Sequence, residues 1–300
     1  MGNSSFQIGV DGGATKTECI LVDEAGTIVA RHLAPGCNAN ITGTAVAAAT
    51  LTSALAALHA QLPSARIAAT HLFMSGVPTF WQEFAATLTG YGRVSAAPDS
   101  LPTLELATHG APGLVIHAGT GSFVAARGPE GSIHYAGGTG WRFGDPGSGY
   151  ELGRRGIARA LLELQGWLPA SRLGPVVRAH TELGDAADAR AITRYFYAHA
   201  EPNRVIAALA PAILRLAEEG DGAAHHVLIE SATELLDLAA AVAAKLFPAT
   251  PPASITTGLS GALLTHPAVL AALKTRTALP LTPITAAPSE GVRRLLARSA

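Results

Sequence analysis

Short apolar runs alternate with polar turns at the start of the chain and then give way to an alanine-rich stretch. Residues 6–34 predict strands with a turn at Gly12-Gly13, because β-rich apolar runs flank that glycine pair. An alanine-rich helix is predicted over 44–62 and another strand over 66–74. The alternation of strands and helices is typical of an α/β protein.

The next stretch continues the alternation with shorter elements. A short helix is predicted over 81–88, a brief strand over 93–96 and a helix over 101–108. Pro102 is tolerated in the first turn of that helix, and Gly110 ends it.

The pattern then restarts. An apolar strand over 113–118 runs into Gly119-Thr120-Gly121-Ser122, and 123–127 forms the return strand. Repetition of strand, glycine turn and strand at about one domain's spacing indicates two related α/β lobes that face each other. Each lobe is then expected to contribute one phosphate-binding turn to a shared cleft.

The remainder is mostly helical. A glycine-dense loop over 137–149 precedes a helix over 154–164, and the helical pattern continues to residue 247. A last strand is predicted over 254–257, entering the turn 258–261, and a terminal helix over 289–298.

The first glycine turn has the chemistry of a phosphate-binding hairpin. Its glycines let the backbone approach a ligand, so that amide N–H groups converge on phosphoryl oxygens, while Thr15 and Thr17 add hydroxyls. Asp11, at the strand end, is placed to hold a hydrated Mg²⁺. An ordinary type I′ hairpin turn is the alternative interpretation. Three glycine and hydroxyl turns, each after an apolar strand, favour a nucleotide cleft.

Composition narrows the functional classes. The chain has 300 residues, 48% of them hydrophobic, which favours two domains. A formal net charge of −1 gives no electrostatic footprint for nucleic acid. Cys19 and Cys37 are too few for a disulfide framework or a four-cysteine metal site. No stretch reaches the roughly 20 apolar residues of a membrane span, and 1–6 lacks a secretory leader pattern. We therefore expect a cytoplasmic protein without nucleic-acid or membrane partners.

The order of these motifs resembles the sugar kinase, Hsp70 and actin superfamily, and within it the N-acetylglucosamine kinase branch grouped with BadF/BadG/BcrA/BcrD-type ATPases. Segment 11–17 is similar to the first phosphate motif, 119–122 to the second and 258–261 to the adenosine motif. Segment 137–150 is similar to the branch signature G-G-x-G…G-D-E/Q-G-S-G-x, with Pro146 where the family has Glu or Gln. Because proline removes an N–H and fixes φ, we expect the sugar loop to differ in shape from that of the family, with consequences for which sugar is bound.

The resemblance implies a fold and a division of the chain. The fold is an α/β, two-lobed actin-like ATPase fold of the ribonuclease H-like type, with an interlobe cleft. The N-terminal lobe is expected over 1–112 with 286–300, and the C-terminal lobe over 113–285.

The resemblance also implies roles for individual residues. Asp99 matches the catalytic aspartate, and Asp11 the residue that positions Mg²⁺ through water. The expected ATP-binding residues are Gly12, Gly13, Ala14, Thr15, Lys16, Thr17, Gly119, Thr120, Gly258, Ser260 and Gly261. The expected sugar-binding residues are Asn38, Ser75, Gly76, Asp99, Gly121, Ser122, Gly138, Thr139, Gly140 and Asp145. A solvated hairpin lysine and an ordinary loop asparagine are the alternatives for Lys16 and Asn38.

Asp99 carries the expected chemistry. It is the one carboxylate between Glu83 and Glu105, and it follows the strand 93–96 directly. A hydroxyl that attacks a γ-phosphoryl group needs a positioned acceptor for its proton, and an aspartate within hydrogen-bond reach serves that role. The alternative is that Asp99 simply caps the helix that follows.

The expected activity is ATP-dependent phosphorylation of the 6-hydroxyl of an amino sugar, with ATP and Mg²⁺ as cofactors. N-acetylglucosamine is the first candidate, and glucosamine or N-acetylmuramic acid are alternatives. The oligomeric state is left open, although dimers are common in the branch that the chain resembles. An ATPase activator of a CoA-ester reductase or dehydratase is a rival, although Cys19 and Cys37 do not suit an Fe–S bridge. A non-catalytic sugar-sensing regulator is another, although no basic recognition helix is visible.

Overall fold

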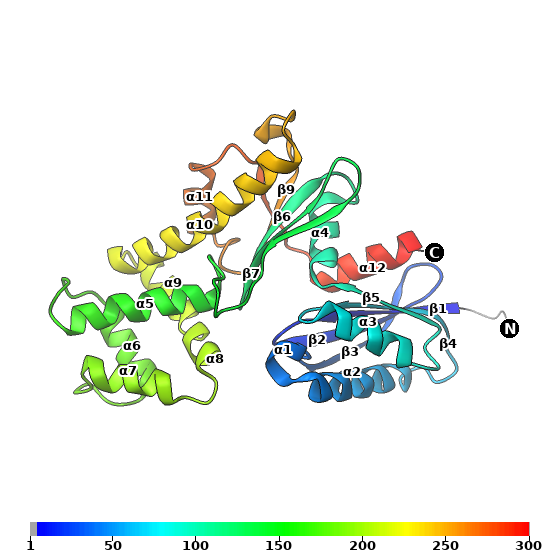
Figure 1. The fold of residues 1–300 in the computed structure, drawn as a ribbon, viewed down its shortest axis with the longest axis horizontal. Coiled ribbons are helices and arrows are strands. Elements are labelled where there is room, and N and C mark those ends of the chain that lie inside the picture. Colours follow the sequence, from blue (N-terminus) through cyan, green and yellow to red (C-terminus); the bar gives the residue numbers. More distant parts are fainter. Residues whose placement is uncertain (1–4, 300) are drawn as a thin grey trace. The chain divides into compact units, whose positions relative to one another are not determined.

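The structure is a computed structural model that describes residues 5–299 (Figure 1). The chain divides into two compact units, which we call unit 1 (Met1–Gly110 with Thr285–Ala300) and unit 2 (Ala111–Ile284). Residues 1–4, on which the expectation about a leader partly rests, lie outside the described residues. Among the helices in the described part of the chain, none has the length and apolar character that crossing a membrane requires.

Unit 1 is built on a five-stranded mixed sheet with the order β3-β2-β1-β4-β5. Strands β1, β2 and β3 are antiparallel neighbours, whereas β4 and β5 run parallel to β1. The carboxyl ends of β1, β4 and β5 therefore lie at one edge of the sheet. The strands are β1 (Ser5–Gly12), β2 (Lys16–Val22), β3 (Ile28–Pro35), β4 (Arg66–Met74) and β5 (Arg93–Pro98).

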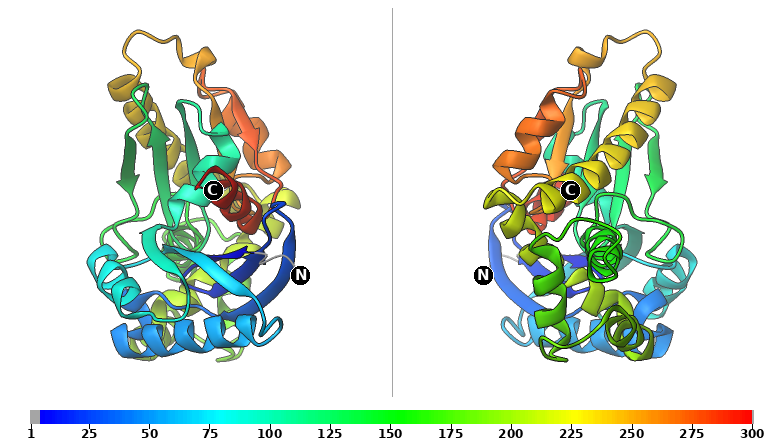
Figure 2. Two further views of the ribbon diagram at one scale, coloured as in Figure 1. Left: turned by 90° about the vertical axis from the view of Figure 1, so that its right-hand side faces the viewer. Right: turned by 90° about the vertical axis from the view of Figure 1, so that its left-hand side faces the viewer.

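Both faces of this sheet are covered, because side chains alternate between them along each strand. Ile8 and Val10 of β1 pack with residues of α2 (Thr44–His59) and α3 (Pro78–Thr87) on one face. Figure 2 shows α2, in blue, running along the outside of the sheet. Ile20, Val22 and Phe73 pack with α12 (Pro288–Ser299) on the other face. The short helices α1 (Ala39–Thr42) and α4 (Ser100–Thr108) complete the unit.

Unit 2 repeats the topology. Its sheet has the order β10-β9-β6-β7-β8, with β6, β7 and β8 antiparallel and with β9 and β10 parallel to β6. The predicted repetition of strand, turn and return strand is confirmed. The fourth and fifth strands of the two sheets also correspond. The strands are β6 (Gly113–Ala118), β7 (Ser122–Arg127), β8 (Ile133–Gly137), β9 (Thr257–Ser260) and β10 (Leu281–Pro283).

Helices supply most of the core of unit 2. Helix α10 contacts β6, β7 and β8 and runs beside the strands in Figure 2. Buried leucines and alanines of α10 join residues of β6, β7, α5 and α9 in one apolar cluster. The helices are α5 (Gly149–Leu164), α6 (Leu173–Thr181), α7 (Ala189–Ala198), α8 (Pro202–Ala207), α9 (Ala210–Glu218), α10 (Gly222–Leu246) and α11 (Pro267–Lys274).

The last strand was predicted three residues too early. Residues Pro252–Ser254 form a 3₁₀ turn, and β9 begins only at Thr257. Gly258 pairs with Val115 of β6 on one side and with Thr282 of β10 on the other, so it is part of the sheet. The sequence placed this glycine in a turn because glycine is depleted in strands, and pairing on both sides overrides that preference.

Candidate active site

The residues predicted to bind ATP and sugar fall into both units, and each group is described within its own unit. In unit 1, the hairpin between β1 and β2 turns at Gly13, whose N–H donates to the carbonyl of Lys16 at 2.9 Å. Neither Gly12 nor Gly13 has a positive φ, so the type I′ turn is wrong. A Cβ at Gly12 would lie 2.4 Å from Cε of Met74, which is the far end of a flexible side chain, and 3.2 Å from Sγ of Cys37.

The segment after β3 packs against this hairpin. Gly36 N–H donates to the carbonyl of Thr15 at 3.2 Å, and Cys37 N–H donates to that of Gly13 at 3.2 Å. Thr17 is fully buried, and its hydroxyl lies 3.0 Å from Sγ of Cys37. The expectation that Thr17 offers its hydroxyl to a phosphate is therefore not supported by its position. Thr15 and Lys16 lie exposed at the tip.

Asn38 and the turn after β4 come together, although they are far apart in the sequence. Asn38 caps α1, with Oδ1 accepting from the N–H of Asn40 at 2.9 Å. Gly76 has φ +96°, and a Cβ there would lie 2.7 Å from the same Oδ1. Ser75 N–H donates to the carbonyl of Gly12 at 2.8 Å, and its Oγ is buried without a hydrogen-bond partner in the described part of the chain. The predicted sugar residues of unit 1 thus border the phosphate hairpin.

Asp11 and Asp99 lie at the same edge of the sheet. Asp11 is level with Phe73 of β4, which is level with Ala97 of β5, and Asp99 follows two residues later. Asp99 occupies the N-cap position of α4, but its side chain makes no capping hydrogen bond. Capping alone therefore does not explain an aspartate at this position.

Both carboxylates have raised pKa values. Burial raises the pKa of Asp11 to about 7, with a further contribution from the charge of Asp99 and an opposing one from Lys16. Burial also raises the pKa of Asp99 to about 6, opposed by the backbone N–H groups of Asp99 and Ser100. Aspartates titrating so close to neutrality are suited to exchange protons with a substrate.

The same electrostatics bears on whether Mg²⁺ fits here. Among the residues described, no group of three or more His, Cys, Asp or Glu side chains is arranged to hold a metal ion. Mg²⁺ commonly keeps several waters and is bound by one or two carboxylates together with substrate phosphates. A half-buried carboxylate whose ionisation is opposed by a neighbouring aspartate is stabilised by a cation, so Asp11 fits a Mg²⁺ that arrives with a nucleotide.

In unit 2, Ala118, which precedes the predicted second phosphate turn, contacts the predicted adenosine motif. Strands β6 and β9 are parallel and end at one edge, at Ala118 and Ser260. Gly261 has φ +97°, and a Cβ there would lie 1.8 Å from the carbonyl oxygen of Ala118. Behind this contact, Oγ of Ser260 lies 3.1 Å from Nδ1 of His117. Of the adenosine motif, Gly258 is buried inside β9, which leaves Ser260 and Gly261 at the edge.

The glycine-dense loop folds back onto the second phosphate turn. Asp145 is only 4% exposed, and a Cβ on Gly121 would lie 3.1 Å from its Oδ2. Burial raises the pKa of Asp145, opposed by the backbone N–H groups of Gly140 and Ser122. Oδ1 of Asp145 and Oγ of Ser122 are buried without hydrogen-bond partners among the described residues. The hydroxyl of Thr139 donates to the carbonyl of Gly144 at 3.1 Å within the loop.

Gly138 completes this group of predicted sugar residues. Its φ is +62°, and a Cβ there would lie 2.2 Å from the hydroxyl of Tyr135. The glycine therefore provides both a left-handed backbone and room for the tyrosine.

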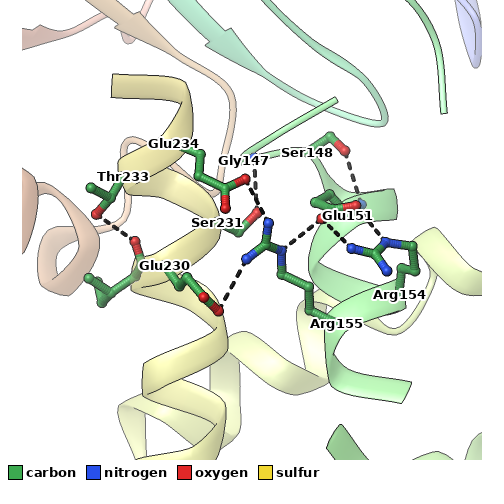
Figure 3. Close-up of polar contacts among 10 residues, drawn as sticks. Gly147, Ser148, Glu151, Arg154, Arg155, Glu230, Ser231, Thr233 and Glu234 are labelled. Atoms are coloured by element: carbon green, nitrogen blue, oxygen red, sulfur yellow. Dashed lines mark hydrogen bonds and ion pairs between the residues drawn. The ribbon is translucent and has the colours of Figure 1, made fainter. Parts of the chain in front are cut away.

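A polar network that sequence reasoning missed fixes the exit of the loop (Figure 3). Oγ of Ser148 accepts from the N–H of Glu151 at 3.1 Å at the start of α5. Glu151 binds Arg155 at 2.7 Å, and Arg155 reaches Glu234 of α10 at 2.6 Å. The Ser-x-x-Glu spacing of a capping box was the signal that could have located the helix start. The contact with α10 has no local sequence signal.

The glycine-dense loop has Pro146 where the branch signature has Glu or Gln, and its hydrogen bonds on either side of this position are intact. Gly147 N–H donates to Oγ of Ser231 on α10 at 2.9 Å, and Ser148 N–H donates to the carbonyl of Asp145 at 3.0 Å. Pro146 lies between these anchors and loses no hydrogen bond that they require.

Comparison with known proteins identifies the family. The sequence model of the BadF/BadG/BcrA/BcrD ATPase family matches residues 8–277. The chain belongs to this family. It is 28% identical over 256 residues to the N-acetyl-D-glucosamine kinase of Dictyostelium discoideum, covering 80% of this chain and 79% of that protein.

Solved structures show the same fold. A candidate N-acetylglucosamine kinase from Chromobacterium violaceum is 29% identical, with a TM-score of 0.77 and coverage of 98% of this chain and 100% of that one. Its counterpart from Porphyromonas gingivalis is 21% identical, with a TM-score of 0.76 and 98% coverage of both chains. A ROK family glucokinase from Streptomyces griseus is 16% identical, with a TM-score of 0.54 and coverage of 98% and 100%. The expected family and the α/β, two-lobed actin-like ATPase fold are confirmed.

Proposed function

We propose that this protein is a sugar kinase that transfers the γ-phosphoryl group of ATP to the 6-hydroxyl of an amino sugar, with N-acetylglucosamine as the first candidate. The family and the kinase relatives support phosphoryl transfer from ATP. The observation that carries the proposal is the carboxylate of Asp99, which lies beside Asp11 and makes no capping hydrogen bond to α4. A kinase of this kind needs a base next to the site of phosphoryl transfer.

Each unit offers candidate nucleotide contacts of its own. The hairpin at 12–16 and the turn at Gly119-Thr120 offer backbone N–H groups to phosphoryl oxygens, and Ser260 and Gly261 border the adenosine. Asp11 holds Mg²⁺ through water. When bound, Mg²⁺ neutralises charge on the phosphate oxygens.

Within unit 1, the candidate sugar contacts are Asn38, Ser75 and Gly76. Within unit 2, they are the group around Asp145. Buried polar atoms without partners cost stability. Among residues 5–299, three such atoms are Oγ of Ser75, Oγ of Ser122 and Oδ1 of Asp145. Sugar hydroxyls can donate to and accept from such groups, which supports their assignment to the acceptor.

Asp99 acts as the base. It accepts the proton of the 6-hydroxyl while that oxygen forms a bond to the γ-phosphorus and the bond from this phosphorus to the bridging oxygen of ADP breaks. The products are the sugar 6-phosphate, ADP and a proton. The raised pKa of Asp99 improves its match to the proton it accepts.

Substitution of Asp99 by asparagine tests this role. We expect Asp99→Asn to lower kcat by about 10² to 10⁴-fold, because that is the usual value of general base catalysis, and to leave the Kd for ATP unchanged. Asp237→Asn, at an exposed position on α10, is the matched control. A coupled ADP-release assay gives kcat, and titration calorimetry gives Kd. Wild-type turnover in Asp99→Asn would remove this residue from its role.

The choice of amino sugar is tested by the same assay across N-acetylglucosamine, glucosamine, N-acetylmuramic acid and glucose. The alternative function, an ATPase activator of a CoA-ester reductase or dehydratase, gains no support. Cys19 and Cys37 are both fully buried within unit 1 and are not exposed to bind an Fe–S cluster at a protomer interface. The homodimer stays one open alternative for the oligomeric state, and the cytoplasmic location stays a prediction.

A further inference from the structure

We propose that the C-terminal helix α12 is a positioning element that sets the separation between Asp11 and Asp99, and that Gly9 and Gly291 are the residues through which it does so. The catalytic consequence rests on the proposed function. The structural part stands on contacts within unit 1.

Helix α12 lies directly on the strand that carries Asp11. Gly9 precedes Asp11 by two residues, so both point to the same face of the sheet. A Cβ on Gly9 would lie 2.2 Å from Cγ1 of Val292 and 3.1 Å from Cδ1 of Leu296. Both α12 side chains are buried. Side chains of α12 thus occupy the space that a side chain at position 9 would fill.

The neighbouring residue of α12 touches the helix that follows Asp99. A Cβ on Gly291 would lie 2.1 Å from the carbonyl oxygen of Pro102, which belongs to the first turn of α4. This neighbour is backbone, so it cannot turn aside as a flexible side chain does. Residues 291 and 292 of α12 therefore contact α4 and β1 respectively.

The other end of α4 is held by the same helix. Nη2 of Arg298 lies 2.9 Å from Oε1 of Glu105, a carboxylate of α4 that is fully buried. Nη1 of Arg294 lies 2.8 Å from Nδ1 of His109, and Arg298 donates to the carbonyl of His109. Contacts at both ends fix α4 along its length, so its first turn cannot move independently of α12.

The contact between Gly291 and α4 is too close to accept an added methyl group without movement of one of the two helices. Real Cβ contacts essentially never fall under 3.0 Å, so a methyl group at position 291 must displace α4 from α12 by roughly 1 Å. That movement shifts the start of α4, and with it Asp99, relative to β1. A misplacement of about 1 Å in a reacting geometry can cost about 10²-fold in rate.

The experiment compares Gly291→Ala, Gly9→Ala, the double variant Gly9→Ala with Val292→Ala, and wild type. Gly222→Ala, at a position where a Cβ would meet nothing within 4 Å, is the control for the same atomic change. We measure kcat and both KM values in the ADP-release assay, and the distance between the carboxyl carbons of Asp11 and Asp99 in crystal structures.

We expect Gly291→Ala and Gly9→Ala to lower kcat by about 10²-fold with KM changed by less than about threefold, because bound substrates keep their own contacts. The separation of the two carboxyl groups in Gly291→Ala should differ from that in wild type. Removing Cγ1 of Val292 should restore kcat in the Gly9→Ala background, and Gly222→Ala should match wild type.

Folded Gly291→Ala and Gly9→Ala with the wild-type kcat and the wild-type carboxyl separation would overturn the proposal. If Gly291→Ala does not fold, the Gly9 and Val292 pair decides, since failure of the second substitution to restore the first contradicts positioning through this contact. If wild type itself shows no turnover with any sugar, the proposed function fails, and the carboxyl separations still decide the structural claim.

Discussion

Replacing Asp11 by asparagine should stabilise unit 1 at alkaline pH while abolishing its contribution to Mg²⁺ binding. Burial and the charge of Asp99 raise the pKa of Asp11 from 3.8 to about 7. The folded protein therefore holds this proton more tightly than the unfolded chain does. The free energy of unfolding must then fall as pH rises from about 4 through about 7, where this carboxyl ionises in the folded state. Asparagine stays neutral and avoids that loss.

The magnitude follows from the size of the shift. A rise from 3.8 to about 7 is about three pKa units, and each unit corresponds to about 1.36 kcal/mol. Above pH 7 the full difference of about 4 kcal/mol applies, as an upper limit because the group is only half-buried and solvent screens it. At pH 5 about 1.2 of these units have been traversed, so the expected difference is about 1.6 kcal/mol. At pH 3 the carboxyl is protonated in both states and the difference vanishes.

Urea unfolding of wild type and Asp11→Asn at pH 5 and pH 8 measures this difference. Trp81 is the tryptophan of unit 1 and is buried, so its fluorescence reports on that unit once Trp141 and Trp167 are replaced by phenylalanine in both proteins. Asp237→Asn should change the free energy of unfolding by less than about 0.5 kcal/mol, as surface substitutions usually do. A variant that is no more stable than wild type at pH 8, or equally stabilised at both pH values, would refute the electrostatic reasoning.

Two further predictions concern turnover. Because the pKa of Asp99 is raised to about 6 and a base must be ionised, kcat should fall about tenfold per pH unit below that value. The midpoint of the profile belongs to the coupled pair of Asp99 and Asp11. A flat profile between pH 4.5 and pH 7 would contradict the role of Asp99 as the base. Asp145→Asn should raise the KM for the sugar by about 10 to 100-fold and leave the KM for ATP unchanged, since a hydrogen bond to a charged group is worth about 1.5–3 kcal/mol. An equal change in both KM values would contradict the assignment of Asp145 to sugar binding.

Local signals in the sequence predicted the elements that carry the turns. The apolar runs over 66–74 and 113–118 coincide with β4 and β6, because buried central strands are nearly continuous in apolar residues. The edge strands β8 and β10 were missed. Ile133 and Tyr135 are largely exposed, and β10 is three residues long and ends in Pro283, so neither edge strand has an apolar signature.

The sequence predicted which residues belong to the candidate site but not how these residues contact one another. Glycine turns are visible in sequence because backbone approach requires glycine. The meeting of Asn38 with Gly76, the burial of Thr17 against Cys37 and the clamp of Arg155 on α10 depend on tertiary packing. Gly9 and Gly291 show the same limit, since neither has a positive φ or lies in a turn, and only the fold shows which helix each one admits.

The central claim is phosphoryl transfer to an amino sugar, and identification of the product tests it most directly. Purified protein is incubated with ATP, Mg²⁺ and N-acetylglucosamine labelled with ¹³C at carbon 6, and the products are examined by ³¹P and ¹³C NMR. The account predicts one phosphomonoester whose phosphorus couples to the labelled carbon, formed in equal amount to ADP. Inorganic phosphate and ADP without a sugar phosphate, or no consumption of ATP across the sugar panel, would contradict it.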